Sequence, residues 1–242
     1  MKFLMIANSF GVNLQTFAKQ IAEANNFDLD IYVLYIGGCS LDNHCRNIDG
    51  DVKGYELFVN GSSTGKFISI KDALEMDKWD VISLQQASHM CALVDTYYPY
   101  FEKVYKYVRE LRPDSKIIFH KTWAYSPINS FKYETVPNFY PPFKFTNAKD
   151  MKAGLDFSVN KVCTEFGIDT IIRSGDVVEK ATAEIGDCYD SQGFHLNEMG
   201  CYLIGCHLVK LFSGKPLTNV YRAPNTGLAT CERCVEFVNK NF

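Results

Sequence analysis

The sequence predicts an α/β fold, a three-layer αβα sandwich around a central, mainly parallel sheet of five strands. Short apolar runs alternate with segments of helical periodicity along the chain. The apolar runs are continuous rather than interleaved with polar residues, which is typical of strands covered on both faces. Hydrophobic residues make up 47% of the 242 residues and charged residues 22%, as in a globular chain with a large core.

Five apolar runs are the predicted strands, and segments with helical spacing lie between and after them. The strands are residues 3–6, 31–36, 81–84, 116–119 and 170–172, and the helices are residues 14–24, 98–111, 149–166 and 197–212. In the first helix, Leu14, Phe17 and Ile21 share one face. Pro113 follows the second helix and Gly167 the third, at positions where helices end. The alternation predicts a doubly wound sheet, because parallel strands need long crossover connections.

Two segments fall outside this alternation. Residues 55–59 and 67–70 flank a segment rich in Gly and Ser, which predicts a hairpin insertion near residues 55–70 that is appended to the sheet. Residues 216–242 follow the last predicted helix as a C-terminal extension. Because no repeat or linker interrupts the chain, we expect residues 1–242 to form a single domain.

Charge and hydrophobicity exclude some classes of partner. The net charge of −3 argues against a nucleic-acid groove or an anionic membrane surface as the main partner. No apolar stretch has the length of a membrane-spanning helix. The apolar residues between Lys2 and Asn8 are few and are needed as a strand, so we expect a cytoplasmic chain unless a leader has been removed. The nine cysteines are irregularly spaced, and we expect reduced thiols.

Ser9 follows the first predicted strand directly, at the edge of the sheet where ligands gather in parallel α/β folds. A serine hydroxyl becomes a nucleophile when a base removes its proton, and the N–H groups of a following helix can stabilise an oxyanion. In the alternative interpretation, Asn8 and Ser9 only cap that helix. His195 lies in a loop before the last predicted helix and is the candidate base.

Two further polar loops belong to the same edge. Gly37 and Gly38 follow the second strand, where the Gly38 N–H could be an oxyanion donor or the pair could form a tight turn with positive φ. Gln85 and Gln86 follow the third strand, and their amides could donate to an oxyanion or a substrate hydroxyl, or anchor the loop backbone. Together the four loops supply a nucleophile, two kinds of donor and a base.

These loops carry a recognisable set of motifs. In order they are Ala-Asn-Ser-Phe, Gly-Gly-Cys-Ser-Leu, Trp-Asp-Val-Ile-Ser-Leu-Gln-Gln-Ala-Ser, Thr-Trp-Ala-Tyr and Gly-Phe-His-Leu. With them the chain resembles the SGNH (GDSL-like) hydrolase superfamily over about residues 2–212, specifically a poorly characterised bacterial branch. The resemblance implies a flavodoxin-like three-layer fold with Ser9 as nucleophile and His195 as base. It also implies an oxyanion hole made by the N–H of Ser9, by Gly38 and by Gln86, which replaces the usual Asn, or by Gln85.

The chain departs from the superfamily pattern at two places. The Gly-Asp-Ser opening is replaced by Ala7, Asn8 and Ser9, which keeps the serine and loses a carboxylate. The superfamily places an Asp three residues before the histidine, and this chain has Gln192 there. An amide cannot stabilise an imidazolium as a carboxylate does. Asp190 or Asp187 could take that role, or the site could work as a Ser–His dyad.

Other residues were considered as ligands for substrate or metal. Trp123 and Tyr125 follow the fourth strand, and with the aromatic residues up to Phe145 they are candidate sugar or acyl platforms or, alternatively, a loop packed on its own rings. Gln85 and His44 are candidate substrate contacts. A metal site of His44 with Cys39 and Cys45, or at Cys231 and Cys234, is disfavoured because no second pair has matching spacing. No cofactor is predicted.

The sequence therefore predicts an esterase that removes acetyl or another short acyl group from a small-molecule or carbohydrate ester. The alternative from another class is a binding protein that keeps the pocket and has lost the triad acid, which Gln192 suggests. A metal-dependent hydrolase is a third, remote interpretation. The sequence predicts no oligomeric state.

Overall fold

The computed structural model describes residues 1–127 and 144–242 of the chain. Its sheet has seven strands in the order β4-β3-β2-β1-β5-β6-β7. The strands are β1 (Lys2–Ala7), β2 (Asp30–Tyr35), β3 (Tyr55–Val59), β4 (Ser62–Ile68), β5 (Val81–Leu84), β6 (Lys116–His120) and β7 (Ile171–Ile172). The first strand lies at the centre, so the segment that follows it emerges at the middle of one sheet edge.

The predicted sheet of five strands is confirmed as the parallel part of this larger sheet. Strands β2, β1, β5, β6 and β7 pair in parallel with one another in this order. The sheet has seven strands and not five, because the predicted hairpin, β3–β4, is part of it. Its strand β3 pairs antiparallel with β2, with Tyr32 opposite Val59 and Tyr35 opposite Glu56.

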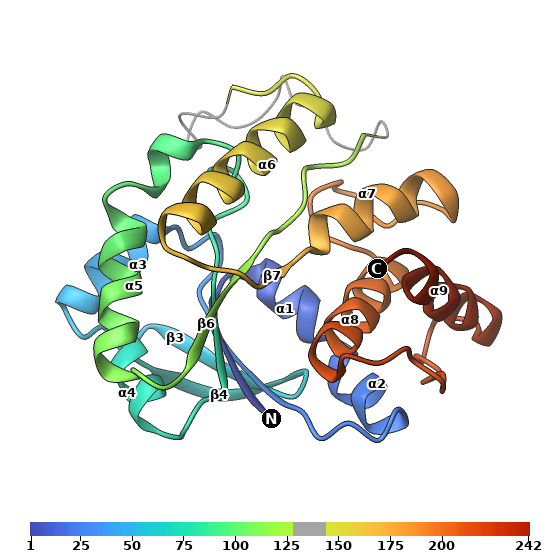
Figure 1. The fold of residues 1–242 in the computed structure, drawn as a ribbon, viewed down its shortest axis with the longest axis horizontal. Coiled ribbons are helices and arrows are strands. Elements are labelled where there is room, and N and C mark those ends of the chain that lie inside the picture. Colours follow the sequence, from blue (N-terminus) through green and yellow to red (C-terminus); the bar gives the residue numbers. More distant parts are fainter. Residues whose placement is uncertain (128–143) are drawn as a thin grey trace.

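Two groups of helices cover the sheet, as Figure 1 shows. One contains α3 (Leu41–Asp49), α4 (Ile70–Glu75), the short 3₁₀ helix η1 (Val94–Tyr97), α5 (Tyr100–Leu111) and α6 (Ala148–Glu165). The other contains α1 (Ser9–Gln15), α2 (Ala18–Ala24), α7 (Ser174–Glu184), α8 (Glu198–Ser213) and α9 (Leu228–Asn241). Members of each group contact one another, which gives the predicted αβα layers. None of the helices in the described ranges is long and apolar enough to cross a membrane.

The first predicted helix, residues 14–24, differs from the structure. It is divided into α1 and α2, and α1 begins at Ser9 because Asn8 is its N-cap. Gly11 allows α1 to approach the sheet closely, since a Cβ at that position would lie 2.5 Å from the Cβ of Ala7. The close approach holds Ser9 at the carboxyl end of β1.

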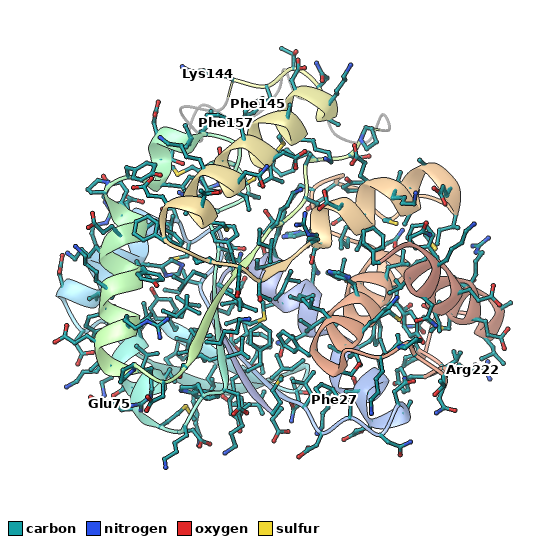
Figure 2. All side chains as sticks on the ribbon, viewed as in Figure 1. Phe27, Glu75, Lys144, Phe145, Phe157 and Arg222 are labelled. Atoms are coloured by element: carbon teal, nitrogen blue, oxygen red, sulfur yellow. The ribbon has the colours of Figure 1, made fainter. Side chains whose placement is uncertain are left out.

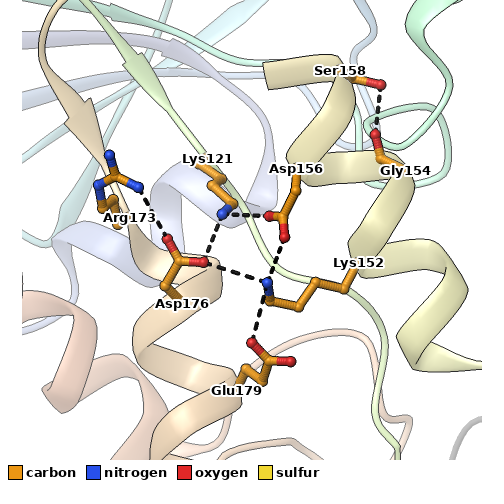
Figure 3. Close-up of polar contacts among 8 residues, drawn as sticks. All are labelled: Lys121, Lys152, Gly154, Asp156, Ser158, Arg173, Asp176 and Glu179. Carbon is orange, nitrogen blue, oxygen red and sulfur yellow. Dashed lines mark hydrogen bonds and ion pairs between the residues drawn. The ribbon is translucent and has the colours of Figure 1, made fainter. Parts of the chain in front are cut away.

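Apolar side chains fill the space between the layers, and ion pairs between side chains connect the elements. Figure 2 shows side chains filling the space between sheet and helices. The end of β6 is tied to both α6 and α7 by Lys121, whose Nζ lies 2.5 Å from Asp156 Oδ1 and 2.6 Å from Asp176 Oδ1 (Figure 3). Lys152 joins the same carboxylates and also contacts Glu179 at 3.2 Å. We call these residues the ion-pair network.

Candidate active site

Ser9 is the first residue of α1, and its hydroxyl is not used to cap that helix. The cap is made by Asn8, whose Oδ1 accepts a hydrogen bond from the N–H of Phe10 at 3.1 Å. The Ser9 hydroxyl instead contacts His195, with Oγ and Nε2 2.8 Å apart. The structure therefore brings together two side chains that are separated by 186 positions in the sequence.

His195 reaches Ser9 from the loop that precedes α8. Its ring packs beside Phe194, with centroids 4.3 Å apart, and against Phe10 at 5.8 Å. Burial lowers the pKa of His195 below its usual 6.5, and Asp190 opposes this shift by stabilising the charged ring. The imidazole is therefore neutral at pH 7, the state in which it can accept a proton from the hydroxyl.

Asp190 is the carboxylate beside this histidine. Its Oδ2 lies 3.9 Å from His195 Nδ1, which is too long for a hydrogen bond and within ion-pair distance when the ring is protonated. Its Oδ1 accepts hydrogen bonds from the N–H groups of Gln192 and Gly193, at 3.0 and 2.8 Å. Asp187, the other candidate, accepts from the N–H of Tyr189. The loop thus orients Asp190 toward the imidazole from a position five residues before it.

The turn after β2 contacts Asn8, the residue before Ser9. Gly38 has φ of +62°, and a Cβ there would meet nothing within 4 Å, so glycine is required by the backbone conformation and not by space. The N–H of Cys39 donates to the carbonyl of Ile36 at 3.2 Å and closes the turn. The Asn8 side chain donates to the carbonyl of Cys39 at 3.2 Å, which ties the turn to the residue preceding Ser9.

The two glutamines make internal contacts. Gln86 donates from Nε2 to the carbonyl and hydroxyl of Thr96, at 2.9 and 3.2 Å. Its Oε1 accepts from the N–H groups of Leu41 and Ala87, at 3.0 and 2.8 Å. Both ends of the Gln86 amide therefore hold loop backbone in place, which was the alternative interpretation. The oxyanion contact predicted for Gln86 is not what the structure shows.

Gln85 belongs to a buried chain of hydrogen bonds beneath the site. It donates to Asn8 Oδ1 at 2.8 Å, and its Oε1 lies 2.9 Å from His120 Nδ1. The other ring nitrogen of His120 lies 2.9 Å from the Ser174 hydroxyl. Burial lowers the pKa of His120 to about 3, so its ring is neutral. This chain of hydrogen bonds holds the Asn8 side chain in place, and Gln85 is therefore a support for Asn8 and not a ligand contact.

The three other predicted substrate contacts are buried. His44, Trp123 and Tyr125 have 1%, 0% and 4% of their surface exposed. His44 contacts the Tyr55 hydroxyl at 2.7 Å, and Trp123 stacks on Phe10 with centroids 4.0 Å apart. These rings support the site from behind and are not platforms at its surface, which corrects the prediction. The aromatic residues Phe131, Tyr133, Phe139, Tyr140 and Phe143 lie outside the described residues.

A small open pocket of about 260 Å³ contains the Ser9–His195 pair. Its lining residues are Ser9, Val12, Asn13, Tyr35, Phe58 and His195. The sequence analysis missed Val12, Asn13, Tyr35 and Phe58. A signal existed for Tyr35, which is the last residue of β2 at the same sheet edge as the Gly38 turn.

Comparisons with known proteins place this geometry in a class. The chain has the α/β fold of the SGNH hydrolases, with helices on both sides of a mainly parallel sheet. The chain matches over 88% of its length a protein from Slackia heliotrinireducens described as a candidate SGNH hydrolase, with 18% identity, a TM-score of 0.60 and 98% of that chain covered. It matches an acetyl xylan esterase over 88% of its length, with 12% identity, a TM-score of 0.53 and 99% of that chain covered.

Within this class the chain belongs to the family DUF4886, described as a domain of unknown function, whose model matches residues 2–233. A crystal structure of a DUF4886 family protein from Bacteroides uniformis is similar over 99% of this chain and 93% of that one, with 26% identity and a TM-score of 0.88. A search of the curated proteins found none that matches. The likeness to these solved structures shows the fold of the chain.

Proposed function

We propose that the protein is a serine esterase that removes acetyl or another short acyl group from a carbohydrate-like ester. The observation that carries the proposal is the 2.8 Å contact between Ser9 Oγ and His195 Nε2 in an open pocket. A hydroxyl within hydrogen-bond distance of a neutral imidazole is the arrangement that generates a nucleophile at neutral pH. The lowered pKa of His195 supports it, because the neutral form is the base.

In the proposed reaction Ser9 Oγ attacks the ester carbonyl carbon while His195 Nε2 takes the hydroxyl proton. The tetrahedral intermediate then collapses, the bond to the alcohol oxygen breaks, and His195 returns the proton to that oxygen. Water attacks the acyl-serine in the second half, again giving its proton to His195. Release of the carboxylic acid restores the Ser9 hydroxyl. No cofactor takes part in these steps.

The negative charge on the carbonyl oxygen needs hydrogen-bond donors during both halves of the reaction. We assign this role to the backbone N–H of Ser9, at the start of α1, and to the N–H of Gly38. Asp190 would stabilise the imidazolium through its charge at 3.9 Å. The pocket of about 260 Å³ is open, so an ester group can reach the Ser9–His195 pair.

Replacement of the proposed nucleophile tests this function. We expect Ser9→Ala to lower turnover of p-nitrophenyl acetate and of acetylated xylose by at least about a thousandfold, because no other group would form the acyl-enzyme. Ser62→Ala, an exposed serine on β4, is the matched control and should leave turnover unchanged. Full activity in folded Ser9→Ala would disprove the assignment.

A non-catalytic binding protein is the second candidate function. Gln192 at the usual acid position favours it, as does the distance of 3.9 Å, which exceeds a hydrogen bond, between Asp190 and His195. A fluorophosphonate probe separates the two candidates, because it reacts covalently with activated serines only. Labelling at Ser9 supports the esterase, and an unlabelled folded protein supports the binder.

A further inference from the structure

Two aromatic side chains lie in the pocket beside Ser9 and His195 without a role in the proposed chemistry. Tyr35 ends β2, and Phe58 lies in β3 of the hairpin. Their ring centroids are 5.6 Å apart and the rings are nearly perpendicular, at 82°. Both are half-buried and line the pocket. We call them the aromatic pair.

The pairing of β2 with β3 places the two rings on one side of the sheet. Phe58 is opposite Val33, and Val33 is two residues before Tyr35, so all three side chains point to the same face. That face is covered by α1, since a Cβ on Gly11 would lie 3.4 Å from Val33 Cγ1. The aromatic pair therefore stands beside the helix that begins with Ser9.

The Tyr35 hydroxyl extends over the turn after β2. A Cβ on Gly37 would lie 3.3 Å from this hydroxyl oxygen, so the missing side chain of Gly37 leaves the space that the phenol occupies. Among the residues that the structure describes, none forms a hydrogen bond with the Tyr35 hydroxyl. The Tyr35 hydroxyl, beside the Gly38 turn, is therefore free to donate a hydrogen bond to a ligand, because no residue of the described chain accepts one from it.

The small pocket is lined by both apolar and polar groups. Val12 and Phe58 supply apolar surface, whereas Asn13 and the Tyr35 hydroxyl are polar. A long acyl chain needs a continuous apolar slot, because each buried polar group without a partner costs free energy. A sugar ring has apolar C–H faces and hydroxyls at its rim, and matches both kinds of group. Aromatic rings also contribute large contact areas with few rotatable bonds.

From this arrangement we infer that the aromatic pair is the subsite for the sugar ring of the acylated substrate. One face of the ring packs on Phe58, and the Tyr35 hydroxyl donates to a sugar hydroxyl, while the acyl group points to Ser9. The inference rests on the proposed esterase function and adds its substrate-specificity residues. It predicts that the pair acts on binding of the sugar and not on the chemistry of the ester.

The test compares an ester with a sugar ring and one without. For xylose tetraacetate we expect Phe58→Ala to lower kcat/KM by about tenfold and Tyr35→Phe by about fivefold, mainly through KM. For ethyl acetate, which has no ring, both variants should stay within about twofold of the wild type. Phe67→Ala is the matched control, because Phe67 lies in the same hairpin, is 59% exposed and does not line the pocket.

Other results of this comparison would contradict either the subsite or the esterase proposal. Equal losses on both esters would overturn the subsite, since the pair would then support the whole site, and unchanged values on both would place the sugar elsewhere. Inactivity of the wild type on both esters refutes the esterase proposal alone. Titration of methyl xyloside into Ser9→Ala, followed by NMR, then decides the subsite. We expect binding that Ser9→Ala/Phe58→Ala weakens about tenfold, and absence of binding or equal binding refutes the subsite.

Discussion

At the scale of single residues, Asn8 and Ser9 have separate tasks although they are adjacent. Asn8 caps α1 and donates a hydrogen bond to the turn that contains Gly38. It also accepts a hydrogen bond from the Gln85 amide, so its three contacts connect three loops. Ser9 is left with its hydroxyl directed at His195. Because Asn8 is 2% exposed, loss of its side chain would leave buried polar partners unsatisfied, and the position of Ser9 depends on it.

The contribution of Asp190 can be measured as a pH profile. Asp190→Asn removes the charge that raises the pKa of His195, while burial continues to lower it. The base is the neutral ring, so activity falls as pH drops through its pKa, and we expect this acidic limb to move to lower pH. We also expect kcat to fall about 10- to 100-fold, less than for a hydrogen-bonded acid.

Asp187→Asn is the control for this experiment, because Asp187 contacts Tyr189 and not His195. It should leave the acidic limb of the kcat/KM profile in place. If the two variants have the same profile as the wild type, Asp190 is not coupled to His195, and the site works as a dyad.

At the scale of elements, the ion-pair network holds α6 and α7 against the end of β6. The Lys121 side chain is 7% exposed, and Asp156 and Asp176 expose 34% and 22% of theirs. Burial acts to raise the pKa of Asp156, but its hydrogen bonds with Lys121 and Lys152 outweigh burial and lower it. The carboxylate is therefore ionised and depends on its cations.

Removal of the central cation should destabilise the protein. We expect Lys121→Met to lower the free energy of unfolding by about 2 kcal/mol, less than for a fully buried pair because Asp156 is partly solvated. Urea denaturation at pH 7 measures the change. The double variant Lys121→Met/Asp156→Leu should recover part of the loss, and a loss equal to the sum of the two single variants would show that the pair is not coupled.

The elements and the site were predictable to different degrees. The parallel strands were readable because strands buried on both faces are continuous apolar runs, and Ser9 and His195 were readable from ordered motifs. The hairpin and its attachment to the sheet were readable from the local pattern, but its partner strand β2 was not, because pairing is a tertiary event. The sequence left two roles open for Gln86, because its partner Thr96 is identified only by the folded loop.

At the scale of the whole molecule, all five histidines have pKa values below 6.5. Burial is the main cause in each, and the values fall to about 4 for His44 and His207 and to about 3 for His120. The folded protein therefore holds these rings neutral in a pH range where the unfolded chain binds protons. Acid will favour the unfolded chain.

This linkage predicts a pH dependence of stability. Between pH 6.5 and about 4 the unfolded state binds more protons, so the free energy of unfolding should fall with pH by about 1.4 kcal/mol per unit for each neutral imidazole. Urea midpoints at pH 7 and pH 5 measure it. His120→Gln should reduce the slope by one proton, and between pH 7 and 9 the histidines should contribute little. A midpoint that does not change from pH 7 to 5 would contradict the prediction.

The hairpin β3–β4 has an evolutionary consequence. It enters and leaves the fold between α3 and α4 and joins the parallel strands only along β2. Ser9 and His195 come from other parts of the chain. Mutations or length changes in the hairpin can therefore alter which ligands the pocket accepts without displacing Ser9 and His195. A hairpin grafted from another family member would be expected to transfer substrate preference as a module.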